Sequence, residues 1–259
     1  MIGNVINAIG GVSRFVNFPH GLNETARFGW RGRNRMGLVM NLQEVGGALA
    51  GLMNVSAQPE SDGFDDKEPL SADVTRRMME GYAYVNYLLR EGIDLFNYGS
   101  SHHWLELNHL VLCGSTPERR QQFRDHIEET ERRFYDDSVG GIGERVEWLL
   151  RNRTTGPEAL AAGIFLSITS SPQLFIEGNR RTATLIASYA LVSHGRAPLV
   201  ATVRDYRAFF ALTDGCKHIH RTRWDQALSF RRQAGRIEHF MRQTADSSFL
   251  IDEEDAPDA

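Results

Sequence analysis

Residues 157 to 195 read PEALAAGIFLSITSSPQLFIEGNRRTATLIASYALVSHG and hold two apolar segments joined by a polar loop. The apolar residues of the first segment recur at helical spacing: Leu160, Ala161, Ile164, Phe165 and Ile168. Pro172 disfavours α geometry at the residue before it, so we expect this helix to end there. A second helix is expected over about 180–194, ended by Gly195.

The same spacing continues on both sides of this pair. Ser71 is a suitable N-cap, and Pro117 suits the first turn of another helix. We expect helices over about 71–90, 104–113, 117–134, 144–152, 156–171, 180–194, 203–213 and 222–243. Convincing alternating strands are scarce, so the predicted fold class is all-α.

Composition shifts divide the chain into three parts. Residues 1–70 are predicted to be an extension and linker, because 56–70 combine proline, glycine and acidic residues. Residues 71–245 form the predicted helical domain. Residues 246–259 are rich in acidic residues and are predicted to be a disordered tail.

The overall composition restricts the class of protein. The 259 residues are 41% hydrophobic, which suffices for one sizeable core, and the formal net charge is −4. A charge this small does not require nucleic acid as a partner, and no stretch reaches the roughly 20 apolar residues that span a bilayer. Cys113 and Cys216 stand alone, which argues against a disulfide framework or a zinc site and predicts a cytoplasmic protein.

The loop before the second helix carries groups suited to phosphate. Gly178 permits a tight turn that points backbone N–H groups into one concavity, and Asn179 follows it. Arg180 and Arg181 occupy the first helical turn, where the helix dipole disfavours cations by roughly 0.3–1 kcal/mol each. A bound phosphate would reverse that sign, and Glu177 offers a ligand for Mg²⁺. An equally valid interpretation is that Glu177 simply pairs with one arginine.

Residues Gln173 to Thr184, QLFIEGNRRTAT, resemble the Fic/Doc active-site motif H-x-F-x-(D/E)-G-N-(G/K)-R-x-x-R. The helical segments on both sides are similar to the two core helices of that family, and a looser similarity extends over residues 75 to 215. The resemblance implies an all-α Fic-like helical bundle with a short hairpin or loop flap.

The resemblance also implies an activity and a set of roles. Fic proteins typically transfer AMP from ATP to a hydroxyl of a target protein. By that likeness Phe175 anchors the loop, Glu177 holds Mg²⁺, Gly178 and Asn179 line the anion hole, and Arg181 contacts the phosphates of ATP or another nucleotide.

Three positions depart from the motif. Gln173 replaces the histidine that serves as general base, and an amide cannot usefully accept a proton near pH 7. Arg180 stands where glycine or lysine is usual, which adds charge beside the phosphates. Thr184 stands where the second arginine is usual, so the side chain that the motif offers to a γ-phosphate is absent.

Several other residues invite two interpretations. Glu80 resembles the glutamate of a Fic inhibitory helix, but its spacing from Thr75 is one residue too long, and we predict an exposed helix residue. His102 or His109 is a candidate replacement base, or an ordinary surface or core histidine.

Two glycine- or base-rich segments are equally open. Residues 139–143 are either a target-docking flap or a plain loop. Two clusters of basic residues are predicted to be solvated rather than phosphate-binding: Arg31, Arg33 and Arg35 in the first part, and His218, His220, Arg221 and Arg223 near the last helix.

Three hypotheses follow for function. The chain is a divergent nucleotidyl or phosphoryl transferase, a catalytically inactive module that binds a ligand or protein, or an enzyme with altered chemistry on a small molecule. Fold alone does not choose among them.

Overall fold

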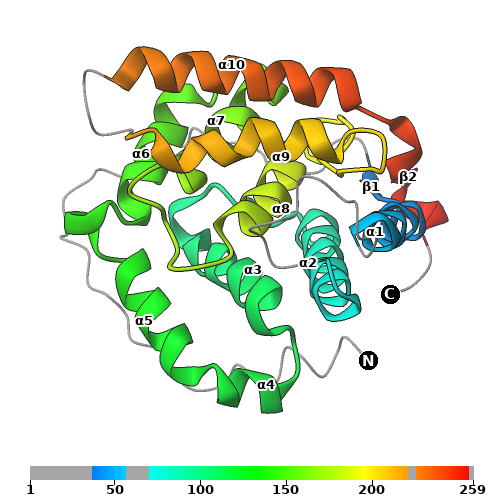
Figure 1. Ribbon diagram of the computed structural model, residues 1–259, viewed down its shortest axis with the longest axis horizontal. Coiled ribbons are helices and arrows are strands. Elements are labelled where there is room, and N and C mark those ends of the chain that lie inside the picture. The colour runs from blue at the N-terminus through cyan, green and yellow to red at the C-terminus, as the bar shows by residue number, and fades with distance from the viewer. Residues whose placement is uncertain (1–36, 57–69, 221–225, 257–259) are drawn as a thin grey trace.

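The computed structural model describes residues 37–56, 70–220 and 226–256, and these are mostly helical (Figure 1). The helices are α1 Leu42–Ser56, α2 Ala72–Arg90, α3 Ser101–Cys113, α4 Pro117–Gln122, α5 Arg124–Phe134, α6 Ile142–Asn152, α7 Pro157–Thr169, α8 Asn179–Val192, α9 Tyr206–Asp214 and α10 Ala227–Thr244. Two short strands, β1 Leu38–Met40 and β2 Leu250–Asp252, form the sheet of the described residues. The predicted all-α class is confirmed.

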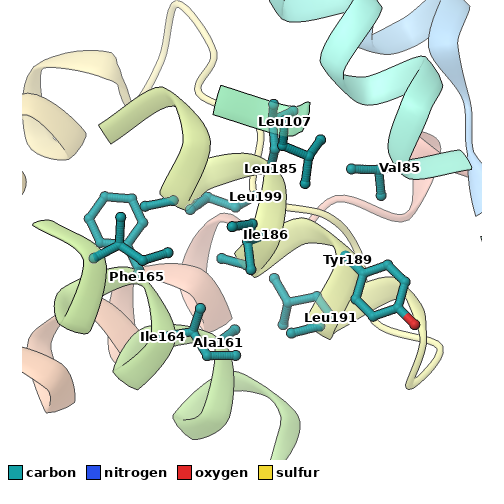
Figure 2. Close-up of a cluster of buried hydrophobic side chains, with 14 of the residues drawn as sticks. Val85, Leu107, Ala161, Ile164, Phe165, Leu185, Ile186, Tyr189, Leu191 and Leu199 are labelled. Carbon is teal, nitrogen blue, oxygen red and sulfur yellow. The ribbon is translucent and has the colours of Figure 1, made fainter. Parts of the chain in front are cut away.

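The predicted helix pair is the centre of the molecule. All residues over 160–169 of α7 and over 182–192 of α8 are buried. Figure 2 shows side chains of both helices in one cluster, which Val85 of α2 and Leu107 of α3 complete. α10 packs along the other side of α7 (Figure 1). Because both central helices are buried all round, their apolar residues are not confined to one stripe.

Helix ends follow the predicted signals in most cases. Ser71 Oγ accepts a hydrogen bond from Val74 N at 3.2 Å, so it is the N-cap of α2. Gly114 ends α3 with φ 78°, and Gly195 follows α8 with φ 71°, the left-handed geometry that favours glycine.

The single helix predicted over 117–134 is broken at Phe123 into α4 and α5. The two halves are held by different neighbours. In α4, Arg119 pairs with Asp73 of α2, whereas α5 packs through the buried Phe134. Because these contacts hold the two segments against different surfaces, a continuous helix does not form.

The predicted extension and tail are wrong for the residues the structure describes. Within the extension, α1 buries Val45 and Leu49 in the core. Within the tail, β2 pairs antiparallel with β1, where Val39 lies opposite Ile251. The tail is predicted to be disordered because it is acidic, yet Phe249, directly before β2, is only 5% exposed and packs in the core.

Asn86 of α2 fixes the strand pair to the helical bundle. Its side-chain oxygen accepts from Met40 N at 2.9 Å, and its amide donates to Met40 O at 2.8 Å. A buried backbone polar group needs such a partner, so one asparagine secures the inner edge of β1.

Candidate functional site

The loop between α7 and α8 enters the second helix through a glycine. Gly178 has φ 71°, and the helix begins at the next residue without a side-chain cap. A Cβ at this position would lie 3.0 Å from Asn108 Nδ2 and 3.2 Å from Val111 Cγ2. The turn and the close approach of α3 both require glycine, as the sequence predicted for the turn.

Asn179 uses its side chain to shape the loop. Its Oδ1 accepts from Phe175 N at 2.9 Å, and its Nδ2 donates to Phe175 O at 2.8 Å. The residue is 6% exposed. The amide therefore closes the loop on itself, and only the backbone of Asn179 is left to face a ligand.

Phe175 anchors the loop in the core, as predicted. It is 1% exposed, and its ring stacks on Phe134 of α5 with centroids 5.6 Å apart. Burial of an aromatic ring of this size makes it the main apolar contact of the loop.

Asn108 of α3 is a loop-holding residue that sequence reasoning missed. Its Nδ2 donates to Glu177 O at 2.9 Å and to Thr182 Oγ1 at 3.0 Å. The side chain is fully buried, and its Oδ1 has no hydrogen-bond partner among the described residues. The signal was present as a lone asparagine inside the apolar run LELNHLVL, where a buried polar group implies a partner.

Gln173 lies between two groups that do not titrate. Its Nε2 donates to Thr169 O at 3.2 Å, and its Oε1 accepts from Asn179 Nδ2 at 3.4 Å. Its backbone oxygen accepts from Arg133 Nη2 at 2.8 Å. Among the described residues no base is hydrogen-bonded to this amide, although His218 lines a pocket that Gln173 also lines.

Arg180 pairs with an acid far away in the sequence. Its Nη2 donates to Asp214 Oδ1 at 2.6 Å, and its guanidinium lies 5.3 Å from the centroid of the Phe210 ring. The alternative in which Glu177 pairs with an arginine is therefore wrong, because Arg180 pairs with Asp214 of α9.

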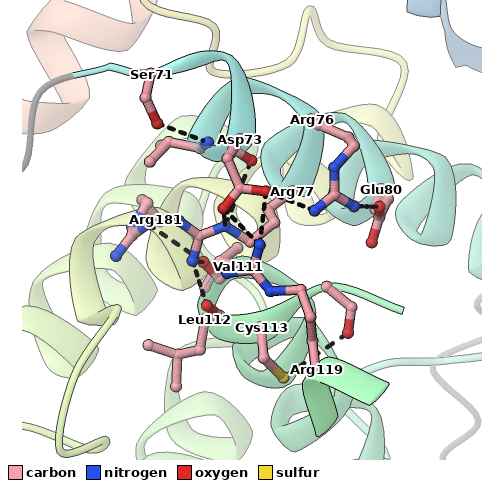
Figure 3. A network of polar contacts seen from close by, with 12 residues as sticks. Ser71, Asp73, Arg76, Arg77, Glu80, Val111, Leu112, Cys113, Arg119 and Arg181 are labelled. Carbon is pink, nitrogen blue, oxygen red and sulfur yellow. Dashed lines mark hydrogen bonds and ion pairs between the residues drawn. The ribbon is translucent and has the colours of Figure 1, made fainter. Parts of the chain in front are cut away.

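Arg181 points towards the end of α3 (Figure 3). Its Nη1 donates to Val111 O at 3.2 Å, and Nη1 of Arg77 donates to the same oxygen at 3.1 Å. Arg77 also reaches Leu112 O, and its Nε lies 3.3 Å from the carboxylate of Asp73. Two cations therefore stabilise the carbonyl end of α3, where the helix dipole favours positive charge.

Glu177 is exposed, and the described residues give it no side-chain hydrogen bond or ion pair. They also contain no group of three histidine, cysteine or acidic side chains placed to hold a metal ion. Mg²⁺ is commonly held by one or two carboxylates together with substrate phosphates. The site fits Mg²⁺ in that way alone, with Glu177 as the carboxylate to hold it, because Asp214 of the same pocket is paired with Arg180.

The charged residues of the loop line one pocket of about 360 Å³. Loop residues 176–181 and Gln173 form one wall, and Phe210, Thr213 and Asp214 of α9 form another. Leu70 and Val74 contribute an apolar edge. Lys217, in the 3-10 turn Gly215–His218, adds a third cation to those of α8.

A second pocket of about 760 Å³ adjoins the first and shares Gln173, Ile176 and Lys217 with it. Its far side contains Arg132 and Val139. The segment predicted as a flap or loop forms the 3-10 turn Asp137–Val139 and the start of α6, so the described residues show a loop there and no hairpin.

The prediction for Glu80 is wrong. Its side chain is only 22% exposed, pairs with Arg76, and accepts a hydrogen bond from Ser115 N at 2.7 Å. The glutamate joins α2 to the α3–α4 turn, which explains its burial. Thr184 likewise serves its own helix, since its Oγ1 donates to Arg180 O at 3.0 Å.

The two candidate replacement bases lie on α3, away from the loop pocket. His109 is largely buried, and desolvation lowers its pKa to about 4. His102 is exposed, with Nδ1 3.1 Å from Gly99 O. Neither borders the loop pocket, whereas Asn108, next to His109, contacts the loop.

The basic clusters are only partly described. His218 lines the second pocket, and His220 forms an isolated bridge with Ser171. The remaining predicted members lie outside the described residues: Arg31, Arg33, Arg35, Arg221 and Arg223.

Comparison of the sequence with protein-family models and with curated proteins found no match. The resemblance to Fic/Doc proteins therefore rests on the motif and its flanking helices. Among the described residues, no helix has both the length and the apolar character needed to cross a membrane.

Proposed function

We propose that the loop pocket binds a phosphate-containing ligand, such as a nucleotide, at the beginning of α8. The observation that carries this proposal is the uncapped start of α8, which lines a pocket together with Arg180, Arg181 and Lys217. The first N–H groups of a helix lack intrahelical partners and carry a partial positive charge. Anions bind readily at such a position.

The surrounding groups support the same ligand class. Gly178 lets the chain turn so that backbone N–H groups face the pocket, and Asn179 holds that turn in shape. Glu177 is exposed beside them and suits a Mg²⁺ ion that also contacts ligand phosphates. Mg²⁺ bound in this way would neutralise phosphate charge.

Binding is better supported than group transfer. In the Fic-like reaction a base takes the proton of a target hydroxyl while AMP leaves ATP as the acceptor ester and pyrophosphate departs. Gln173 cannot take that proton, and its amide is already hydrogen-bonded to Thr169 and Asn179. Loss of general-base help typically lowers a rate by about 10²–10⁴.

This observation favours a second candidate, a binding module without ordinary AMP transfer. A divergent transferase would need the proton to leave through the substrate or through a different base, such as His218 of the adjoining pocket. A protein target and a small-molecule acceptor both remain compatible with the adjoining pocket, which has room for either kind of group.

The binding proposal is tested by calorimetry with AMP, ADP, ATP and pyrophosphate, each with and without Mg²⁺. Wild type should bind at least one of them, and Arg181→Gln should weaken binding by about tenfold, the loss expected for one charge-assisted hydrogen bond. Arg124→Gln is the matched control, because Arg124 is 65% exposed and pairs with Glu128 on α5. Absence of binding by folded wild type to all four ligands would refute the proposal.

The chemistry is tested separately with ATP labelled on its α-phosphate. Labelling of a protein target by Gln173→His but not by wild type would identify the natural protein as a binding module on an otherwise competent site. Labelling by wild type that Glu177→Ala abolishes would instead establish a transferase that manages without the histidine.

A further inference from the structure

The ion pair between Arg180 and Asp214 joins the start of α8 to the end of α9. Arg180 is the second residue of α8, where the dipole repels a cation, and Asp214 is the last residue of α9, directly before the 3-10 turn Gly215–His218. The Nη2–Oδ1 distance of 2.6 Å brings both into a favourable pair. Asp214 therefore offsets the unfavourable position of Arg180.

The pair lies inside the pocket that we assign to phosphate. Both residues line it, and their side chains are 29% and 47% exposed. The carboxylate thus occupies part of the Arg180 guanidinium and adds negative charge to the same space. A ligand phosphate that approaches α8 therefore meets another anion, the Asp214 carboxylate, already bound to Arg180.

Phe210 keeps the guanidinium at this position while its partner changes. It stands one turn before Asp214 on α9, and the Arg180 guanidinium lies over its ring. This contact between a cation and an aromatic face does not depend on the carboxylate. Arg180 therefore has a support that would remain when a phosphate takes over from Asp214.

We propose that Asp214 is an internal competitor for ligand phosphate, so that the pocket selects ligands able to replace a carboxylate on Arg180. The inference rests on the proposed function and specifies its ligand class. An anionic phosphate forms an ion pair with Arg180 on binding, whereas an uncharged nucleoside forms none there. The more negative the phosphate group, the more it is repelled by Asp214 and the more it benefits from removal of that charge.

The test compares three ligands that share one nucleoside: adenosine, cyclic AMP with a single negative charge, and AMP with a doubly charged terminal phosphate. Calorimetry is performed on wild type and Asp214→Asn. We expect the substitution to raise the affinity for cyclic AMP about threefold and that for AMP about tenfold, and to leave the affinity for adenosine unchanged. The reason is that the exposed Asp214 charge repels one ligand charge in cyclic AMP and two in AMP.

Arg180→Gln provides the second arm. It should weaken AMP binding, and adding Asp214→Asn to it should restore less than the single Asp214→Asn gains, because no guanidinium remains to be released. Glu128→Gln is the control, since Glu128 is an exposed acid that pairs with Arg124 within α5, away from α8 and α9. It should change no affinity. If Asp214→Asn does not fold, Asp214→Ser takes its place.

The possible outcomes separate the two proposals. Equal affinity of wild type and folded Asp214→Asn for AMP would overturn the competitor role and leave phosphate binding intact. Weaker binding by Asp214→Asn, or an equal gain for adenosine, would also overturn it, because Asp214 would then position Arg180 or shape the pocket. Failure of both proteins to bind any phosphate compound would overturn the proposed function itself.

Discussion

The loop before α8 has an inner side that packs against the core and an outer side that faces the pocket. The inner side consists of Phe175, Asn179 and the backbone of Gly178, which are buried or in close contact with α3 and α5. The outer side consists of Glu177 and Arg180, which face the pocket with partial or full exposure. One side gives the loop its shape, and the other supplies its charges.

The difference shows where a change of function can occur without loss of fold. Inner residues are tied to hydrogen bonds and packing that no ligand provides, so substitution there costs stability. Outer residues contribute little to packing, and their effect on stability is close to that of surface charges. The motif position that differs most in chemistry, Gln173, lies between the two sides with its amide bonded inward.

The largest effect is expected at the inner side, from Phe175→Ala. Removing a buried ring that stacks on Phe134 should reduce the free energy of unfolding by about 3–5 kcal/mol. Urea unfolding followed by circular dichroism measures it. Leu228→Ala is the control, because that leucine is 67% exposed, and a similar loss in both variants would contradict the distinction.

A smaller loss is expected for Asn179→Ala. The substitution leaves the N–H and C=O of buried Phe175 without their partners, which should cost about 2–3 kcal/mol. It should also weaken any ligand that depends on the shape of the loop. A variant as stable as wild type would show that water replaces the amide and that the inner side is less closed than its contacts imply.

Acid should destabilise the inner side through α3, which supplies Asn108 to the loop and also carries His109. Burial lowers the folded-state pKa of His109 to about 4, so between pH 6.5 and 4 the unfolded chain binds the extra proton. Its contribution is complete above pH 6.5 and is lost as pH falls, by about 1 kcal/mol between pH 7 and 5.5.

The pH prediction is checked by comparing unfolding of wild type and His109→Gln at several pH values. The variant should lose stability less steeply over this range, because glutamine does not titrate. Parallel pH curves for the two proteins would assign the acid sensitivity to other groups.

The smallest effect on stability is expected at the outer side, from Glu177→Gln. The side chain is exposed and forms no ion pair among the described residues, so unfolding should change by less than about 0.5 kcal/mol. The Mg²⁺-dependent part of nucleotide binding should disappear, as calorimetry with and without Mg²⁺ would show. A destabilised variant would mean that Glu177 belongs to the structural side of the loop.

Local signals were enough to predict the helices that frame the site. The spacing of apolar residues in α7 and α8 and the glycines after α3 and α8 act within a few residues of one another, so they can be read from sequence. The same holds for Gly178 and Phe175, whose roles follow from the turn and from apolar character.

Distant pairings were not predictable in this way. β1 and β2 each have three residues and become strands because they pair with each other across most of the chain. Phe123 interrupts a helix because its two halves pack against different surfaces. Tertiary contacts determine both the strand pair and the helix break, and they override local propensity.

The sequence by itself determined that the chain is helical, where the loop before α8 lies, and which charged residues that loop carries. Tertiary structure alone decided that Asp214, and not Glu177, neutralises Arg180, and that Asn108 holds the loop from α3. The physical reason is the distance along the chain over which the interactions act. Helices and turns depend on neighbours in the chain, whereas ion pairs and buried hydrogen bonds depend on which surfaces the core brings together.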